Sequence, residues 1–380
     1  MRLVFINYPL ETFTPTQSGA LATIIWECCR IAKSEGVEPT VITRTSQVPR
    51  FPWPQTILID PPSVPEDPLI EKLYRVERKL TGWRLLRQRA YALRVVSAIG
   101  KAGLEQSSFV LINDPEMAVF LRRRCPKSRI LHWFQNQQEC KPRFRSQFAA
   151  SADVVCGVSD FTSRWIAEYY GVKEVATLYN GVDVEQFYPS SQSPEGVPVI
   201  NFVGRTGIEK APDLLLKAGI ALMAKTSHFG LQLVGSNHWD RFELDVYQRE
   251  LQELVDQLTR GGIEVRRPGH VGRNALPAEF QKAQIHVVPS RWDEAFGLST
   301  VEGMASGLAV IASNTGGTPE VVGESGTLFP RDSVEGLTEA LFSLITDEGL
   351  RHERKRRARE RALEFTWNRT WSGLKNQIGM

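Results

Sequence analysis

The chain has 380 residues, of which 42% are hydrophobic and 23% are charged. These proportions are ordinary for a soluble globular protein and exclude the disordered, collagen-like and coiled-coil classes. Its 46 Lys and Arg nearly balance 43 Asp and Glu, so net charge predicts no nucleic-acid partner. The length suggests two domains, each large enough to bury a core without metals or disulfides.

The cysteines and the N-terminus indicate the cellular location. Five cysteines form no Cys-x-x-Cys pair and have no histidine at zinc-ligand spacing, which favours reduced thiols and no metal site. The first apolar run stops at Asn7 and Pro9, too early for a secretory signal, and no stretch approaches the length of a membrane span. We expect a cytoplasmic protein, with peripheral contact on the cytoplasmic face of the membrane left open.

Short β-branched runs alternate with helical patterns along the whole chain. In the first half the patterns predict strands at 3–7, 39–43, 56–59, 109–113, 129–133, 154–158 and 176–179, and helices at 20–34, 71–99, 115–123 and 161–170. In the second half they predict strands at 199–203, 231–234, 263–266, 285–288, 309–312 and 327–329, and helices at 211–224, 241–259, 300–306 and 334–344.

This alternation predicts two α/β domains with doubly wound parallel sheets. A polar segment rich in Pro and Ser, residues 189–198, separates them as a linker. We therefore assign 1–188 and 199–365 to two Rossmann-like domains. Ligands of such sheets bind at the carboxyl ends of the strands.

The most informative segment leaves a predicted buried strand, crosses a loop and enters a helix near Leu298. The first N–H groups of a helix suit a phosphate, and Gly297 lets a ligand approach the backbone. Glu294 and Glu302 are eight positions apart and can face one cleft. A capping box formed by Ser299 and Glu302 is an equally good explanation of the second carboxylate.

Two further segments have residues suited to a phosphate. Arg205 and Lys210 flank a predicted strand-to-helix loop, where two cations could stabilise the charge on a diphosphate. The alternative is a pair of solvated basic residues. In the other segment, 313–320, Thr318 can cap a short helix that follows two adjacent glycines. The chain has no Asp-x-Asp sequence, the usual signature of a carboxylate-held metal at a diphosphate.

These segments occur in a fixed order with Asn180-Gly-Val-Asp183, and together they resemble family 4 of the retaining glycosyltransferases, enzymes with the GT-B fold. The resemblance covers residues 150–365 closely and the first 150 in outline. It implies two Rossmann-like domains that face a central cleft, with the acceptor in the first domain and the donor in the second. It also implies that 366–380 cross back to pack on the first domain.

The resemblance assigns roles to residues of the second domain. Arg205 and Lys210 would bind the donor diphosphate together with the backbone of Leu298 and Ser299. Glu294 would contact the sugar hydroxyls, and Glu302 would accept hydrogen bonds from the ribose. The remaining donor contacts would come from Phe296 and Gly297 in the sugar pocket and from Val271 near the base.

In the first domain the resemblance points to Gly19 and His132. Gly19 would face the phosphates from the first strand-to-helix loop, which reads Gln17-Ser-Gly19 where relatives often have two glycines. His132 would end a strand on the cleft side, beside the reacting carbon. A structural role is the alternative for a single histidine.

The implied activity is that of a retaining hexosyltransferase. It would use a nucleotide-diphosphate sugar, with a UDP-sugar favoured and GDP-mannose next, and would need no cofactor or metal. The acceptor would be a hydroxyl of a glycan, lipid-linked or small-molecule substrate in cell-surface polysaccharide or glycolipid synthesis. A GT-B sugar phosphorylase and a catalytically silent binding subunit remain alternatives.

Two basic stretches bear on the acceptor. Residues 71–101 contain nine Lys or Arg and two Glu, with an apolar stripe at helical spacing, a profile typical of a helix on an anionic membrane. The alternative is a solvated helix packed on its own domain. Residues 351–361 add seven basic residues on a late helix. A nucleic-acid partner is not expected, because stacking aromatics are few.

Overall fold

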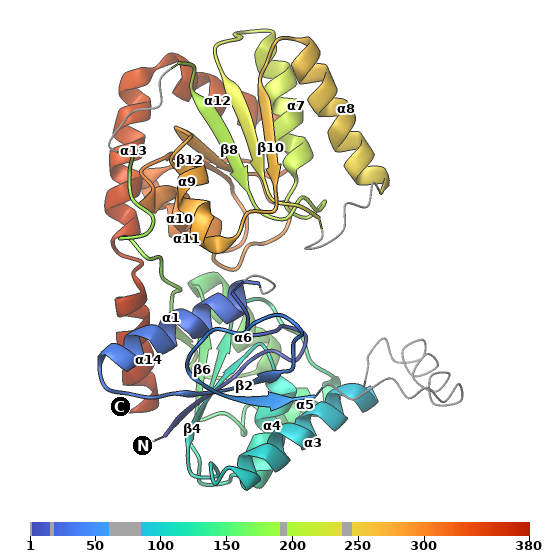
Figure 1. Ribbon diagram of the computed structural model, residues 1–380, viewed down its shortest axis with the longest axis vertical. Helices are drawn as coiled ribbons and strands as arrows, with labels where there is room; N and C mark the ends of the chain where they lie inside the picture. Colours follow the sequence, from blue (N-terminus) through green and yellow to red (C-terminus); the bar gives the residue numbers. More distant parts are fainter. Residues whose placement is uncertain (1, 16–18, 61–84, 191–195, 238–244) are drawn as a thin grey trace. The chain divides into compact units, whose positions relative to one another are not determined.

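The computed structural model describes residues 2–15, 19–60, 85–190, 196–237 and 245–380. The chain forms two compact units, each built around a parallel sheet (Figure 1). Unit 1 comprises Met1–Val158, Thr162–Leu178 and Trp371–Met380, and unit 2 comprises Ser159–Phe161 and Tyr179–Thr370. The sequence predicted two α/β domains, each with a parallel sheet, and the structure confirms both sheets.

The sheet of unit 1 has seven parallel strands in the order β3-β2-β1-β4-β5-β6-β7. The strand order reverses between β1 and β4. The strands are β1 (Leu3–Ile6), β2 (Thr40–Arg44), β3 (Gln55–Ile59), β4 (Ser108–Ile112), β5 (Ile130–Phe134), β6 (Val154–Gly157) and β7 (Ala176–Thr177). Their continuous apolar runs are buried because helices cover both faces of the central strands.

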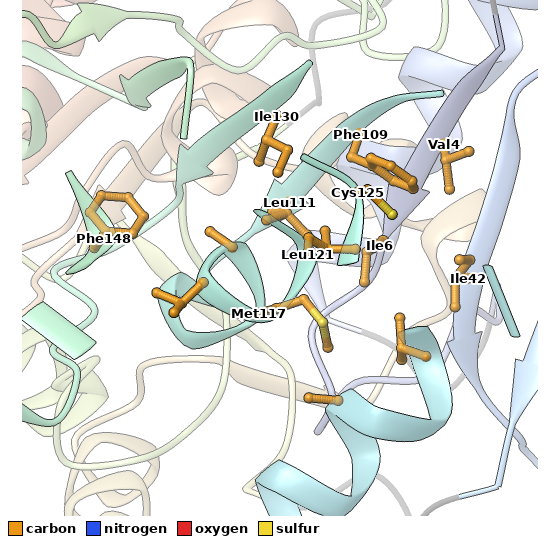
Figure 2. Close-up of a cluster of buried hydrophobic side chains, with 14 of the residues drawn as sticks. Val4, Ile6, Ile42, Phe109, Leu111, Met117, Leu121, Cys125, Ile130 and Phe148 are labelled. Atoms are coloured by element: carbon orange, nitrogen blue, oxygen red, sulfur yellow. The ribbon is translucent and has the colours of Figure 1, made fainter. Parts of the chain in front are cut away.

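The helices of unit 1 follow the predicted pattern, with one addition. They are α1 (Ala20–Ser34), α3 (Leu85–Lys101), α4 (Pro115–Arg124), α5 (Pro142–Phe148) and α6 (Asp160–Tyr170), of which α5 was not predicted. Figure 2 shows Val4 and Ile6 of β1, Phe109 and Leu111 of β4, and Met117 of α4 gathered in one buried cluster. This core fixes the β1 and β4 strand ends relative to each other.

The sheet of unit 2 has six parallel strands in the order β10-β9-β8-β11-β12-β13. The strands are β8 (Val199–Val203), β9 (Gly230–Val234), β10 (Val265–Gly269), β11 (Ile285–Val288), β12 (Ala309–Ser313) and β13 (Thr327–Phe329). Apolar residues of α7 (Pro212–Met223), α8 (Val246–Arg260) and α12 (Val334–Thr346) form one buried cluster with these strands. The shorter helices are α9 (Leu276–Phe280), α10 (Leu298–Ala305) and α11 (Thr318–Val322).

The basic stretch at 351–361 lies on α13 (Glu348–Ala362), where arginines turn to the backbone of their own unit. Arg359 donates to the carbonyls of Phe187 (2.9 Å) and Ala305 (2.6 Å), and Arg354 donates to that of Glu324 (2.7 Å). These guanidinium groups hold α13 in place. Part of the positive charge counted in the sequence is therefore used in structure.

The chain returns to unit 1 at its last helix, α14 (Trp367–Ile378), whose residues from Trp371 onward belong to that unit. Glu35, just after α1, accepts hydrogen bonds from Trp371 Nε1 (3.0 Å) and Lys375 Nζ (2.6 Å). The first and last helices of unit 1 are thereby joined through one carboxylate.

Residues 71–84 of the basic stretch at 71–101 lie outside the described residues, and α3 begins at Leu85. The membrane contact expected from the basic residues of 71–101, among them Arg75, Arg78, Lys79 and Arg87, therefore stays a prediction. Within the described ranges, no helix combines the length and the hydrophobicity that a bilayer-spanning segment needs.

Candidate functional site

Three loops at the carboxyl ends of β8, β11 and β12 form one edge of the unit 2 sheet. The loop after β8 meets the loop after β11, because the N–H groups of Arg291 and Trp292 donate to Glu209 O at 3.0 and 3.3 Å. The loop after β12 meets the same segment, since Gly317 N donates to Glu294 O at 2.6 Å. The predicted strand-end segments are thus brought together.

Glycine at position 316 is required by this packing. Gly316 has a φ of +56°, and a Cβ there would lie 2.4 Å from Glu294 O. A side chain would both strain the backbone and push the two loops apart. The adjacent glycines therefore serve the close approach of two loops, which the sequence had suggested only as a loop open to an anion.

A buried carboxylate, Asp213, ties the start of α7 to the loop after β11. Arg291 donates to both of its oxygens at 2.7 and 2.8 Å, while Tyr247 Oη and Lys217 Nζ donate at 2.5 and 3.1 Å. Burial alone would raise the pKa of Asp213, but these hydrogen bonds outweigh it and lower the pKa to about 2. The carboxylate stays ionised and holds the segments that contain Lys210 and Glu294.

Lys210 and Glu294 form an ion pair at this edge. Ser290 Oγ donates a second hydrogen bond to the same carboxylate oxygen, at 2.5 Å. The Lys210 side chain is 28% exposed and that of Glu294 is 9% exposed, so the pair is accessible mainly from the lysine side. The two residues predicted to bind diphosphate and sugar are therefore partners of each other.

Arg205 lies on the same loop as Lys210 but in a different environment. Its side chain is 63% exposed and pairs with Glu209 at 2.9 Å. Such an exposed pair contributes little to stability, and the long side chain can change partners at small cost. Arg205 is therefore the more exposed of the two predicted cations.

Glu302 lies on α10 with only 3% of its surface exposed, and Arg273 Nη2 contacts its Oε1 at 2.7 Å. Burial raises the pKa of Glu302, and the charge of Arg273 opposes that rise. The capping-box explanation is wrong, because Gly297 occupies the N-cap position and no side chain caps α10. The carboxylate instead projects toward the loop after β10, where Arg273 lies.

The N-terminus of α10 is shaped by Gly297, whose φ is +82°. A Cβ there would lie 2.8 Å from Thr300 Oγ1. Leu298 and Ser299 follow as the first two helical residues, whose N–H groups have no carbonyl partner inside the helix. Phe296, 2% exposed, packs 5.6 Å from Phe365 between ring centres, so its side chain belongs to a buried aromatic contact.

The remaining unit 2 positions are less decisive. Val271 is half-buried in the loop between β10 and Arg273. Thr318 does not cap α11, because the N-cap position is Gly317 and no side-chain cap bond forms. Within the described ranges, no group of three or more His, Cys, Asp or Glu residues is arranged to hold a metal ion.

In unit 1, Gly19 is the residue immediately before α1, and Gln17 and Ser18 lie outside the described residues. The Glu11 carboxylate lies against this helix start, where Oε1 accepts a hydrogen bond from Ala22 N at 3.2 Å. Burial raises the pKa of Glu11 to about 7, against the lowering effect of the helix N–H groups. A carboxyl group of the chain itself thus occupies the place where a phosphate was predicted.

His132 does not end its strand, because β5 continues through Phe134. The predicted place at the end of the strand is therefore wrong, while the role beside the reacting carbon stays a prediction. Its ring is fully buried, 4.1 Å from Phe134 and 5.1 Å from Phe148 between centres, and lies close to the backbone of Asp114. Burial lowers the pKa of His132 to about 3, so the ring is neutral. The surroundings favour the structural role left open by the sequence.

The sequence did not reveal Asp213, Arg291, Arg273, Ser290 or Glu11 as parts of these sites. Asp213 and Arg291 are 78 positions apart, and each has the local pattern of an ordinary charged residue at a helix start or loop. Ser290 had a usable signal, since it lies four positions before Glu294 in the same loop.

Residues 183–361 match the family model described as glycosyl transferases group 1, which confirms the family expected from the motifs. A D-inositol 3-phosphate glycosyltransferase from Saccharomonospora viridis is 31% identical over 254 residues, covering 62% of this chain and 58% of the relative. A phosphatidyl-myo-inositol mannosyltransferase from Mycolicibacterium smegmatis is 30% identical over 220 residues, covering 56% of this chain and 53% of the relative. The chain thus spans less than two thirds of these curated relatives.

Solved structures match over the whole chain. A sucrose-phosphate synthase from Thermosynechococcus elongatus has a TM-score of 0.75 at 19% identity, covering 99% of this chain and 98% of that one. Anabaena HepE, solved with UDP and glucose, has a TM-score of 0.74 at 15% identity, covering 100% and 99%. At these identities the likeness shows the fold alone, and it confirms the GT-B class.

Proposed function

Because residues 183–361 carry the glycosyl transferases group 1 domain and the chain has the GT-B fold, we propose that it transfers a hexose from a nucleotide-diphosphate sugar to an acceptor hydroxyl, with retention of the anomeric configuration. The observation that carries this proposal is the Lys210–Glu294 pair beside the start of α10. It combines a cation, a carboxylate and free helix N–H groups at the sheet edge where α/β proteins bind ligands.

Each group has a distinct role in the proposed donor site. Lys210 and Arg205 neutralise the diphosphate, and the N–H groups of Leu298 and Ser299 donate to its oxygens. Glu294 accepts hydrogen bonds from sugar hydroxyls, while Ser290 holds its orientation. These fixed positive groups would do the electrostatic work that a divalent metal does in other nucleotide-sugar enzymes.

The second carboxylate of the proposed donor site, Glu302, binds the nucleoside part of the donor. Glu302 accepts hydrogen bonds from the ribose hydroxyls, and the charge of Arg273 opposes the rise in pKa that burial causes in this carboxyl group. Gly297 lets the donor approach the backbone, and the loop at Val271 lies against the base. Gly19 faces the phosphates only after the Glu11 carboxyl yields its place at the start of α1.

The proposed step breaks the bond between the anomeric carbon and the diphosphate oxygen and forms a bond from that carbon to the acceptor oxygen. The departing diphosphate oxygen takes the acceptor proton, so both bonds change on one face of the sugar and the configuration is retained. Binding of the donor exchanges partners within the ion pair. Lys210 turns from Glu294 to phosphate, and Glu294 turns from Lys210 to sugar hydroxyls.

A UDP-sugar is the favoured donor, supported by the fold shared with Anabaena HepE, whose structure holds UDP and glucose. GDP-mannose is next, because one relative is named a mannosyltransferase. The acceptor hydroxyl belongs to a glycan, a lipid-linked sugar or a small molecule. The acceptor binds in unit 1.

The test compares two lysine variants by nucleotide release from a panel of UDP- and GDP-sugars. Lys210→Ala is expected to lower the rate about 100-fold or more, because it removes a charged donor from the departing diphosphate. The matched control is Lys282→Ala, which breaks another lysine–carboxylate pair of unit 2, with Glu279 at 2.8 Å, away from these loops. The control should keep the wild-type rate.

Three results would contradict the proposal in different ways. Equal turnover in Lys210→Ala and the control removes the lysine from the mechanism. Nucleotide binding without any release indicates a silent binding subunit. Sugar 1-phosphate formed from inorganic phosphate and a glycan, with no use of nucleotide sugars, indicates a phosphorylase.

A further inference from the structure

Unit 1 has a pocket of its own at the point where its strand order reverses. Tyr8 and Leu10 follow β1, Asn113 and Asp114 follow β4, and Glu139 follows β5, and all of them line this pocket. In doubly wound sheets the loops separate at such a reversal and leave a crevice at the carboxyl ends of the strands. The topology therefore explains why the pocket forms here.

The backbone at this point is held in an uncommon conformation. Asn113 has a φ of +53°, which few residues other than glycine adopt, and its Oδ1 accepts a hydrogen bond from Gln135 N at 2.7 Å. The turn brings Asp114 to the start of α4, where its carboxylate accepts from Met117 N at 3.0 Å. Strain of this kind persists where the surrounding structure fixes it, often at ligand sites.

The lining is half apolar and half hydrogen-bonding. Pro9, Leu10 and Phe120 supply hydrocarbon surface, and Leu10 is 65% exposed. Asn113 and Gln138 supply amide groups on the polar side. This combination suits a ring that has C–H groups on its faces and hydroxyl groups at its edges. Apolar side chains can pack on the faces, while amides and carboxylates form hydrogen bonds with the hydroxyls.

The charge of the lining has one sign. Asp114, Glu116 and Glu139 are all in it, and none of the described lining residues is Lys, Arg or His. Lys141, which is not part of the lining, lies 3.3 Å from Glu116 and offsets that carboxylate. Burial raises the pKa of Asp114 to about 7, and the charge of Glu116 raises it further, so the site already resists one more negative charge.

We infer that this pocket binds the acceptor as an uncharged polyol and discriminates against phosphorylated acceptors. This inference rests on the proposed function, because only a transferase has an acceptor. The selectivity of the pocket can nevertheless be measured without catalysis. It separates this chain from the relatives named for D-inositol 3-phosphate, and the family match, which begins at residue 183, does not reach unit 1.

The test measures binding of matched probes to the full chain by ligand-observed NMR. The pairs are myo-inositol with its 3-phosphate and glucose with glucose 6-phosphate, each at millimolar concentration. The uncharged member is expected to bind about tenfold more tightly, the effect of one unfavourable charge contact near a protein surface. Equal or tighter binding of the phosphorylated member overturns the inference, and so does the absence of binding by both uncharged probes.

Variants connect the selectivity to the pocket. Glu139→Gln should reduce the discrimination between the members of a pair severalfold, because it removes a negative charge and keeps the side-chain shape. Asp114→Asn should do the same at pH 8 and have a smaller effect at pH 6, because the Asp114 carboxyl has a pKa of about 7 and loses its charge over this range. Glu168→Gln, an exposed carboxylate on α6 outside the lining, is the matched control and should leave the ratio unchanged. A ratio that responds equally to all three variants would assign the effect to net charge and refute the pocket.

UDP binding is measured in the same samples by calorimetry. A chain that binds no nucleotide but prefers the uncharged probes contradicts the proposed transferase function and retains the pocket. A chain that binds UDP but prefers phosphorylated probes retains the proposed function and contradicts the pocket's selectivity. The two failures are therefore distinguishable.

Discussion

At the carboxyl edge of the unit 2 sheet the charged side chains are paired with one another, whereas at the same edge of unit 1 three carboxyl groups line one pocket. In unit 2, hydrogen bonds lower the pKa of Asp213 and keep it ionised, and Lys210 forms an ion pair with Glu294. In unit 1, Asp114 and Glu11 both have a pKa raised to about 7 by burial. One fold type thus gives one edge where the charged side chains are paired and another where carboxyl groups gather around a pocket.

The difference originates in residues rather than in topology. Both edges contain a non-glycine residue with positive φ just after a strand or its loop, Asn113 in unit 1 and Ala211 in unit 2. In unit 1 the next residue is a carboxylic acid, and in unit 2 the residue before is Lys210. A residue with positive φ is therefore followed by an acidic side chain in unit 1 and preceded by a basic one in unit 2. Changes at the two edges should have separable effects.

Breaking the buried pair in unit 2 should have the largest effect on stability. Asp213→Asn leaves Arg291 without its bidentate partner and should lower the free energy of unfolding by about 3 kcal/mol. Because the folded pKa is lowered to about 2, the wild-type contribution is present above about pH 4 and is lost as pH falls toward 2. Urea denaturation at pH 7 and pH 3 measures both effects.

The contrary outcome for Asp213→Asn would be an unchanged denaturation midpoint at pH 7. It would mean that Asp332, which accepts from Arg291 Nε at 2.5 Å, holds the guanidinium unaided. The loops after β8 and β11 would then be organised by the exposed pair instead of the buried one.

Separating the two loops of unit 2 should have an intermediate effect. Gly316→Ala places a Cβ against Glu294 O, while Gly262→Ala has the same kind of positive φ with no atom within 4 Å. Subtracting the second cost from the first isolates the contact, which should amount to about 2 kcal/mol. Thermal unfolding of both variants gives the difference, and donor affinity should fall only in Gly316→Ala. Equal melting temperatures would show that the loops yield freely.

Removing a titrating carboxyl from unit 1 should have little effect on stability at low pH, and its pH dependence should be opposite to that of Asp213. Since burial raises the folded pKa of Asp114 to about 7, its protonation favours the folded state below about pH 4, and this stability is lost as pH rises to 7. Asp114→Asn keeps a residue suited to the N-cap of α4 and removes the titration. The variant should therefore lose less stability than the wild type between pH 4 and pH 7, by roughly 1.4 kcal/mol for each unit by which burial raises the pKa.

Denaturant midpoints of Asp114→Asn and the wild type across this range provide the measurement. Parallel pH profiles would show that the Asp114 carboxyl is exposed to water. Unit 1 would then have no carboxyl with a raised pKa at this position to compare with Asp213 of unit 2. Glu11 titrates in the same range, so the variant should flatten the profile only in part.

The strands could be predicted because parallel strands covered on both faces have continuous apolar runs, and each predicted strand overlaps an observed one. Strand ends were less certain, and that uncertainty misplaced His132. A boundary error of one residue put a core side chain at the ligand edge. Pairs such as Asp213 with Arg291 could not be predicted, since only the tertiary fold brings residues so distant in the chain together.

The return of the last ten residues to unit 1 has a consequence for biosynthesis. Unit 2 leaves the ribosome before Trp371 and Lys375, which supply hydrogen bonds to Glu35 near the start of the chain. During translation unit 2 can therefore complete its core while unit 1 still lacks its final helix. Although its N-terminal part is synthesised first, unit 1 can be completed only when α14 is available. That helix is encoded more than 300 codons after Glu35.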